Sequence, residues 1–293
     1  MAAIRVGNPS SFVSYQKSSL KSSNPSAAAR AGVKKQEKKE HFDDIYTQET
    51  PVLFKEKILD GLDYKSDNYN KTLFDRSVLP LCRQIEKAGG IVQYVDLCCC
   101  FGNTTLACVN GMSVDEIRDS WRDEQICFSL DKPRRFSART LGIDISTNAL
   151  DYGKTAGIFD STIACDLNKI LLSGDTPQHQ ELVSSLASAD VLVAAAALVY
   201  LDLQTIDALL SAFSASTKPG LVLVNFLNPF NLEKADKTKR LLLQHLHFVS
   251  SQATQHRLLS PMERQNFPGE EWAHLELWVL SRRPAAAEDS GKD

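Results

Sequence analysis

The sequence predicts an α/β fold in which a mostly parallel sheet is covered by helices on both faces. Three observations lead to this prediction. Strand-like and helix-like segments alternate after residue 90. The strand-like segments are almost continuously apolar, as in strands that are buried on both sides. The last two strand-like runs have no clear helix between them, which indicates a closing hairpin and hence one antiparallel strand.

Length and composition are those of a water-soluble globular protein. The chain has 293 residues, of which 43% are apolar and 24% charged, and no apolar run reaches the roughly 18 residues of a membrane span. Seven cysteines are an odd number, and no secretory segment follows Met1. We therefore expect reduced thiols, a cytoplasmic protein and no membrane partner.

Residues 1–40 differ in charge from the rest of the chain. They hold eight Lys/Arg residues against two glutamates, a net charge of +6, so the remaining residues carry −9 of the overall −3. The absence of acidic residues before position 37 and the abundance of serine predict a disordered tail, with an organelle-targeting peptide as the alternative. An acidic body repels phosphate backbones, which disfavours a nucleic-acid partner.

Residues 41–88 are expected to form a helical cap. Aromatic and aliphatic residues recur there at helical spacing. Residues 70–89 read as an amphipathic helix with Leu73, Leu79, Cys82 and Ile85 on one face, and Pro80 predicts a kink or a break in it.

The main domain is expected over residues 89–284, followed by a short tail at 285–293. Strands are predicted at 90–97, 140–145, 161–167, 189–197, 221–227, 247–259 and 273–283. Helices are predicted from about residue 103 and over 146–157, 201–217 and 231–246. Ser146 is a suitable N-cap for the second of these helices, and Gly157 a suitable stop.

Three aspartates fall at or near the ends of predicted strands, namely Asp96, Asp144 and Asp166. Ligands of open α/β sheets bind at the carboxyl ends of the strands, so these side chains should face one crevice. A carboxylate at the end of the second strand can accept hydrogen bonds from ribose hydroxyls, and one at the end of the third from an exocyclic amine. Together they predict a pocket for an adenosine-containing cofactor.

The loop after the first strand argues against a dinucleotide. A dinucleotide site requires three glycines and an acid about 20 residues further on. This chain offers Cys98-x-Cys100-x-Gly102, and Asp144 lies 48 residues beyond Asp96 because residues 113–139 are inserted. A cofactor without phosphate fits this loop better.

The run "VDLCCCFG" resembles motif I of class I S-adenosylmethionine-dependent methyltransferases, D-L-G-x-G-x-G, with cysteines in place of the first two glycines. "LGIDIS", "ACDL", "ADVLVAAAALVYLD" and "KPGLVLVNFL" resemble later motifs of that superfamily, so the resemblance covers about residues 90–283. It is closest to a branch with a D-[LVI]-[GC]-C-S-[YF]-G loop and a helical insertion before the second motif. The implied fold is a Rossmann-like, seven-stranded methyltransferase sheet, mostly parallel with one antiparallel strand, plus an N-terminal helical lid.

The resemblance implies S-adenosylmethionine as the cofactor. Asp144, with Ile145, would hold the ribose, and Asp166, with Leu167, the adenine amine. The loop that contains Asp96, Cys98, Cys100 and Gly102 would face the methionine part. Because cysteine side chains need space that glycine leaves empty, we expect this loop to sit slightly differently.

The three adjacent cysteines do not predict a metal site. Neighbouring residues cannot easily converge on one ion, and zinc sites usually use C-x₂₋₄-C pairs with partners elsewhere. Small, soft side chains that fill a buried turn are the preferred interpretation, and no metal is expected.

Residues after the fourth and fifth strands should line the site for the methyl acceptor. We take Tyr200 and Asn228 as candidate catalytic residues, while Tyr46, Tyr64 and Tyr69 are candidates for an aromatic lid. Methyl transfer from a sulfonium needs mainly proximity and alignment, so no catalytic dyad is required. No N-P-P-Y/F or D-P-P-Y/F run follows the fourth strand, which disfavours methylation of DNA bases or glutamine.

The predicted function is methyl transfer to an amine or hydroxyl of a small molecule, in specialised metabolite biosynthesis. Alternatives are a protein or RNA methyltransferase, and a non-catalytic relative that binds a cofactor or partner. A nicotinamide or nucleotide-sugar oxidoreductase would need a phosphate-binding loop that the sequence lacks. The sequence gives no sign of the oligomeric state.

Overall fold

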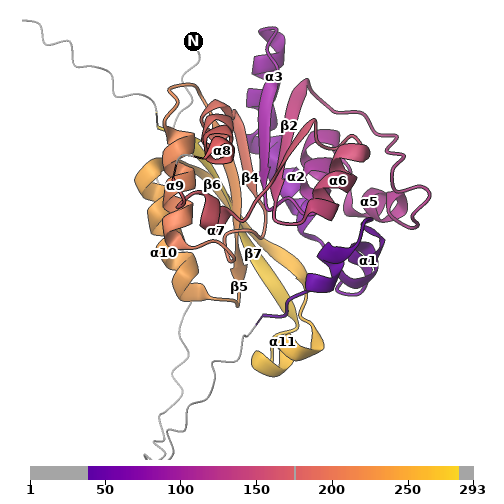
Figure 1. The fold of residues 1–293 in the computed structure, drawn as a ribbon. Coiled ribbons are helices and arrows are strands. Elements are labelled where there is room, and N and C mark those ends of the chain that lie inside the picture. The colour runs from indigo at the N-terminus through magenta and orange to yellow at the C-terminus, as the bar shows by residue number, and fades with distance from the viewer. Residues whose placement is uncertain (1–38, 175, 284–293) are drawn as a thin grey trace, which may run out of the picture. The chain divides into compact units, whose positions relative to one another are not determined.

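A computed structural model describes residues 39–174 and 176–283. Seven strands form one sheet in the order β3-β2-β1-β4-β5-β7-β6 (Figure 1). The strands are β1 (Val92–Leu97), β2 (Ala138–Asp144), β3 (Ser161–Ala164), β4 (Val191–Ala194), β5 (Leu221–Asn228), β6 (Leu246–Leu258) and β7 (Trp272–Arg282). Strands β1 to β5 pair in parallel, and β7 is antiparallel to both β5 and β6. The predicted fold class, mostly parallel with one antiparallel strand, is confirmed.

The helical elements surround this sheet. Before β1 lie η1 (Asp43–Thr47), α1 (Val52–Phe54), η2 (Lys55–Asp60), α2 (Ser66–Ser77) and α3 (Leu79–Lys87). Between β1 and β3 lie α4 (Asn103–Thr105), η3 (Leu106–Asn110), α5 (Val114–Ser120) and α6 (Thr147–Thr155). The rest are α7 (Leu167–Ile170), α8 (Pro177–Ser188), α9 (Leu203–Ser214), α10 (Leu232–His245) and α11 (Pro261–Asn266). Among the described residues, no helix is long and apolar enough to cross a membrane.

The two faces of the sheet are covered by different sets of helices, because alternate residues of each strand point to opposite sides. Val95 and Leu97 of β1 pack in the core beneath α8, α9 and α10, which lie together on one side of the sheet (Figure 1). Val92 and Tyr94 of the same strand pack against α2 and α3 on the other side. Because helices cover both faces of the sheet, a strand such as β1 must be apolar at almost every position.

Predicted and observed helix boundaries agree at the capped positions. The Ser146 side chain accepts a hydrogen bond from the amide of Ala149 and caps α6. The single helix predicted over 70–89 is instead two helices, α2 and α3, that meet at Val78. Pro80 lies in the first turn of α3, where its missing N–H costs no hydrogen bond.

Three helices are additions to the predicted elements. Helices α7 and α8 lie between β3 and β4, and α8 buries only Leu182 and Leu186, which gives a weak apolar period. Helix α11 joins β6 to β7 where the sequence predicts a hairpin, and Ser260 and Glu263 form a capping box at its start. The predicted tails over 1–40 and 285–293 lie outside the described residues, apart from Lys39 and Glu40.

Candidate functional site

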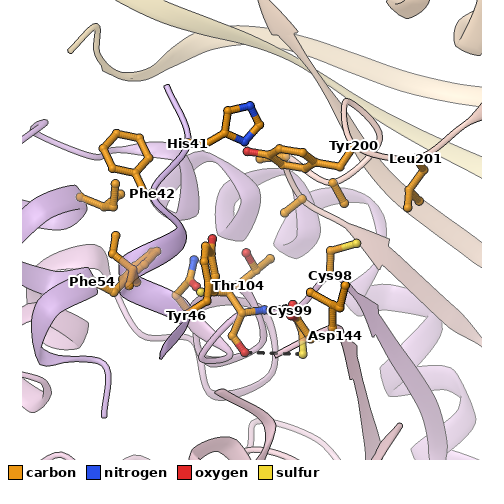
Figure 2. Close-up of a pocket in the computed structure, with 18 of the residues that line it drawn as sticks. His41, Phe42, Tyr46, Phe54, Cys98, Cys99, Thr104, Asp144, Tyr200 and Leu201 are labelled. Atoms are coloured by element: carbon orange, nitrogen blue, oxygen red, sulfur yellow. Dashed lines mark hydrogen bonds between the residues drawn. The ribbon is translucent and has the colours of Figure 1, made fainter. Parts of the chain in front are cut away.

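A cavity of about 360 Å³ lies at the carboxyl ends of the parallel strands. Residues that follow β1, β2, β3 and β4 line it from the sheet side, and residues 39–46 line it from the outside. The strand order reverses between β1 and β4, which is where open α/β sheets bind ligands. Figure 2 shows Cys98 and Asp144 on one side of the cavity and His41 and Tyr200 on the other.

The loop after β1 adopts a glycine-like backbone without glycines. Cys98 and Cys100 both have φ of +52°, and Gly102 has φ of +88°. Such left-handed conformations cost a non-glycine residue about 1–2 kcal/mol. The Cys99 amide donates to the Ile143 carbonyl at 3.1 Å, which ties the loop to β2. The cysteines thus keep the turn that glycines would make, and Cys98 and Cys100 line the cavity.

Asp144, the last residue of β2, anchors this loop. Its Oδ2 accepts a hydrogen bond from the Cys100 amide at 2.8 Å, and its Oδ1 accepts one from the Ser146 amide at 2.9 Å. Only 7% of Asp144 is exposed, and burial raises its pKa. The carboxylate keeps lone pairs free, since it accepts two hydrogen bonds here and has about four acceptor positions.

Asp96 and Asp166 hold carboxylates at two other points of the cavity. Asp96 is 1% exposed and accepts a hydrogen bond from the Thr105 hydroxyl at 2.7 Å. Burial raises its pKa to about 7. Asp166 caps α7 and pairs with Lys169 at 2.9 Å, and that hydrogen bond with Lys169 lowers its pKa. Both carboxylates line the cavity together with Asp144.

The remaining predicted cofactor residues divide into two groups. Ile145 and Leu167 line the cavity, and Ile145 is 69% exposed beside Asp144, which offers an apolar surface at the mouth. Gly102 does not line the cavity. It precedes α4, and a Cβ at this position would lie 2.8 Å from the Ile158 side chain, so glycine is required there for packing.

Of the two candidate catalytic residues, only Tyr200 lines the cavity. Its hydroxyl contacts the ammonium of Lys39. Asn228 is exposed at the end of β5 and is not among the lining residues, whereas its neighbour Leu227 is. Consecutive residues of a strand point to opposite faces, so Leu227 takes the position that Asn228 was expected to hold. Of the three lid tyrosines, Tyr46 and Tyr64 line the cavity and Tyr69 does not.

The wall behind β4 consists of small side chains. Ala195, Ala196 and Ala197 line the cavity there. Ala196 has φ of +54°, and its amide donates to Oδ1 of the buried Asn225 at 2.5 Å. This stretch therefore presents methyl groups and backbone, but no titratable side chain, to a ligand.

Several lining residues were not predicted from the sequence. They are Lys39, His41, Phe42 and Asp43 from the N-terminal segment, Asn103 and Thr104 from α4, and His256 and Arg257 from β6. Arg257 and Glu263 form a buried ion pair with distances of 2.7 and 2.9 Å. The contact of β6 with the start of α2 brings His256 to the cavity. The sequence near His256 does not show this contact, and a histidine inside a strand-like run is the only local sign that the residue could be functional.

The lining carries more carboxylates than cations. Asp43, Asp96, Asp144 and Asp166 line the cavity. Of the described lining residues, only Lys39 and Arg257 are Lys or Arg. The charge of Arg257 is balanced by Glu263, and that of Asp166 by Lys169. Neither Lys39 nor Arg257 lies in the loop after β1. The site therefore suits a cationic ligand better than a pyrophosphate.

The three adjacent cysteines carry protonated thiols in a largely buried turn. All seven cysteines are free, and the described part of the chain contains no cluster of three His, Cys, Asp or Glu side chains that could hold a metal ion. Burial raises the pKa of the Cys98 and Cys100 thiols, so both are protonated at neutral pH.

Among known proteins, the chain is similar only to solved structures. No family model matches the chain, and no curated protein matches it. Geranyl diphosphate C-methyltransferase from Streptomyces coelicolor A3(2), solved with Mg²⁺, a geranyl thiolodiphosphate and S-adenosyl-L-homocysteine, is 14% identical with a TM-score of 0.41, over 82% of this chain and 96% of that one.

Two further solved structures are similar at the same level. Magnesium protoporphyrin IX methyltransferase from Synechocystis PCC 6803, with bound S-adenosylmethionine, is 10% identical with a TM-score of 0.37, over 73% of this chain and 79% of that one. A TehB-like S-adenosylmethionine-dependent methyltransferase from Corynebacterium glutamicum is 13% identical with a TM-score of 0.35, over 68% and 86%. Because these scores lie below 0.5, no conclusion about activity rests on them. By its own strand order and single antiparallel strand, the chain has the Rossmann-like, seven-stranded methyltransferase fold.

Proposed function

We propose that this chain is a class I S-adenosylmethionine-dependent methyltransferase that methylates an amine or a hydroxyl of a small molecule in specialised metabolite biosynthesis. The observation that supports this most is the set of three carboxylates, Asp96, Asp144 and Asp166, around a loop without phosphate-binding groups. A sulfonium cofactor is cationic and carries no phosphate, so it matches this lining in charge.

In this proposal, different residues at the carboxyl edge of the sheet bind different parts of the cofactor. Asp144 accepts hydrogen bonds from the ribose hydroxyls with the lone pairs that Cys100 and Ser146 leave free. Ile145 packs on the adenine, and Asp166, with Leu167, receives its exocyclic amine. The loop with Cys98 and Cys100 faces the methionine part, and Asp96 lies beneath it.

The chemistry asks little of the protein beyond geometry. A nucleophile on the acceptor attacks the methyl carbon in line with the departing sulfide, so the site must align the two and exclude water. The alanines at 195–197 and the ring of Tyr200 supply a close, largely apolar wall for this step. The N-terminal segment covers the cavity from outside through contacts of Tyr46 and Thr47 with α6 and its cap.

A small acceptor is favoured because the cavity is walled by residues 39–46 as well as by the sheet. Its volume of about 360 Å³ is near the lower end of small-molecule sites, about 300–1,000 Å³. A polymer would have to thread a side chain or base past this segment. The macromolecular alternative therefore becomes an outcome of the labelling experiment below.

Calorimetry tests the cofactor assignment. We expect S-adenosylmethionine to bind the wild-type protein and NAD not to bind. Asp144→Asn should weaken binding by about 10–100-fold, because hydrogen bonds to a charged group contribute about 1.5–3 kcal/mol. Asp151→Asn, on an exposed position of α6, is the matched control. Equal affinities of the wild type and Asp144→Asn would remove Asp144 from the site.

Labelling tests the acceptor class. The protein is incubated with S-adenosyl-[methyl-³H]methionine and a cell extract that has been divided into small-molecule and macromolecular fractions. Label in the small-molecule fraction supports the proposal, and label in the protein or RNA fraction replaces it with the macromolecular alternative. Binding of the cofactor without any label would show a non-catalytic relative.

A further inference from the structure

His256 is a buried histidine of β6 that reaches the cavity and that the chemistry above does not use. It is 6% exposed and lines the cavity, as do its neighbours Arg257 and Tyr64. The Tyr64 and His256 rings meet edge to face with centroids 5.5 Å apart. The backbone amide of Lys65 donates to the His256 carbonyl at 2.8 Å, so the start of α2 fixes the strand at this point.

One ring nitrogen of His256 is occupied and the other is available. Nδ1 forms a hydrogen bond with the buried hydroxyl of Ser66. In the described part of the chain no group forms a hydrogen bond with Nε2. Nε2 is also not one of the fully buried polar atoms that lack a partner, so it retains some exposed surface. Since the residue lines the cavity, Nε2 is the nitrogen that a ligand there would meet.

A buried hydrogen-bond network lies beside Ser66 and His256. Asp67 is fully buried and accepts hydrogen bonds from Asn103 at 2.7 Å, Thr104 at 2.9 Å and Asn70 at 3.0 Å. The Tyr64 hydroxyl lies beside this group and accepts a hydrogen bond from Asn103 at 3.4 Å. The Ser66 hydroxyl can either donate to Nδ1 of His256 or accept from it. When Ser66 accepts, the imidazole is the Nδ1–H tautomer, and a lone pair remains on Nε2.

The surroundings of His256 also keep it neutral. Burial lowers its pKa well below the usual value of 6.5, and the positive charges of Arg257 and Lys39 lower it further. Glu263 is paired with Arg257, and the two oxygens of Asp67 accept from Asn70, Asn103 and Thr104. An uncharged imidazole with a free lone pair is the form that acts as a general base.

We propose that His256, as the Nδ1–H tautomer whose proton Ser66 accepts, is the catalytic base that takes the proton of the methyl acceptor through Nε2, and that Ser66 and the Tyr64 ring position it. This inference rests on the proposed function and deepens it, because it identifies the acceptor as a group that must lose a proton. Thioethers and tertiary amines, which carry none in their nucleophilic form, are outside the predicted class.

The methyl acceptor loses its proton to His256 as it gains the methyl group. A lone pair of the acceptor oxygen or nitrogen forms the new bond to the methyl carbon, while the sulfur–methyl bond breaks and its electron pair stays on the sulfur of S-adenosylhomocysteine. The acceptor proton passes to Nε2 of His256. Release of that proton to water restores the neutral imidazole, which burial and the two neighbouring cations favour.

Kinetics of the full-length chain test the proposal. The measured rate is that of label transfer from the cofactor to the small-molecule fraction of the extract. His256→Asn keeps a side-chain donor for Ser66 and removes Nε2. We expect a rate about 10²–10⁴-fold lower, the usual contribution of a general base, with an unchanged Kd for S-adenosylmethionine. His274→Asn, at an exposed position of β7, should keep the wild-type rate.

The pH profile distinguishes catalysis from structure. The wild-type rate should be level near neutrality and fall in acid, below pH 6.5, as Nε2 becomes protonated. The His256→Asn rate should lack this acid limb and rise with pH as the acceptor ionises by itself. A wild-type rate and profile in His256→Asn would overturn the proposal.

Nitrogen-15 NMR of labelled histidine gives a readout that does not depend on an acceptor. We expect His256 to be neutral and protonated on Nδ1 between pH 6.5 and 8, with Ser66→Ala shifting the tautomer toward Nε2–H. A proton on Nε2 in the wild type would overturn the base assignment. Failure of the proposed function shows differently, as the absence of S-adenosylmethionine binding in calorimetry.

Discussion

At the scale of single residues, the site depends on groups held in costly states. Cys98, Cys100 and Ala196 have left-handed backbones without being glycine, and Asp96 is a carboxyl almost without exposed surface. Such states persist only where the surroundings impose them, and they cluster at functional sites. All four of these residues line the cavity.

The cost of the left-handed cysteines can be measured. Cys100→Gly should leave the free energy of unfolding unchanged or raise it by up to about 1 kcal/mol, because relief of backbone strain offsets the entropy of glycine. Cys165→Gly, at a cavity position outside the left-handed region, should instead lower it. Urea denaturation gives both values, and a large loss in Cys100→Gly would show that the thiol contributes more than the strain costs.

The raised pKa of Asp96 predicts a dependence of stability on pH. Its pKa moves from 3.8 to about 7 in the folded state, so its ionisation destabilises the fold as pH rises through this interval, by up to about 4 kcal/mol. Asp96→Asn should therefore be more stable than the wild type at pH 8 and nearly equal to it near pH 4. Asp119→Asn, at an exposed position of α5, should show no such difference in urea denaturation.

At the scale of elements, the strands and the capped helices followed from the sequence, whereas the pieces that complete the cavity did not. Apolar strands and Ser146 carry local signals, so β1, β5 and α6 were predicted nearly to the residue. Helix α8 buries only Leu182 and Leu186, which is too few for a clear period. His256 reaches the site where β6 meets the start of α2, through contacts with Lys65 and Ser66, and no local pattern encodes a contact with residues nearly two hundred positions away.

Helix α11 depends on one ion pair for its attachment. Arg257 and Glu263 are both buried, at 3% and 0% exposure, and Glu263 also accepts from the amides of Ser260 and Glu40. Removal of one partner of a buried pair costs about 3–5 kcal/mol. We expect a loss of this size in Glu263→Gln by urea denaturation, and none in Glu270→Gln, which is exposed.

The same pair sets an acid limit for this part of the molecule. Burial alone would raise the pKa of Glu263, but its hydrogen bonds with Arg257 outweigh this and hold the pKa below 4.5. The stabilisation is therefore complete above pH 4.5 and is lost as pH falls through the lowered value. Acid unfolding of Glu263→Gln should lack this component, and an acid transition identical to that of the wild type would contradict the assignment.

At the scale of the whole molecule, the sheet edge, the N-terminal segment and the end of β6 close on one cavity. A ligand that binds only the folded chain stabilises it by about 2.7 kcal/mol at 100 times its Kd. For a protein of this size that corresponds to a rise in Tm of roughly 5–10 °C. Scanning fluorimetry should show this rise with S-adenosylmethionine and no rise with NAD, and the reverse pattern would favour the oxidoreductase alternative.

The three consecutive alanines behind β4 have a consequence for how acceptor preference can change. These alanines present only methyl groups and backbone to the cavity, so they cannot distinguish one acceptor from another. In the proposed function, that distinction must come from the opposite wall, which residues 39–46, Tyr64 and the end of β6 form. Under the proposed function, exchange of residues 39–46 for another segment of equal length should change the preference among acceptors. Enlargement of an alanine would instead shrink the chamber for every acceptor alike.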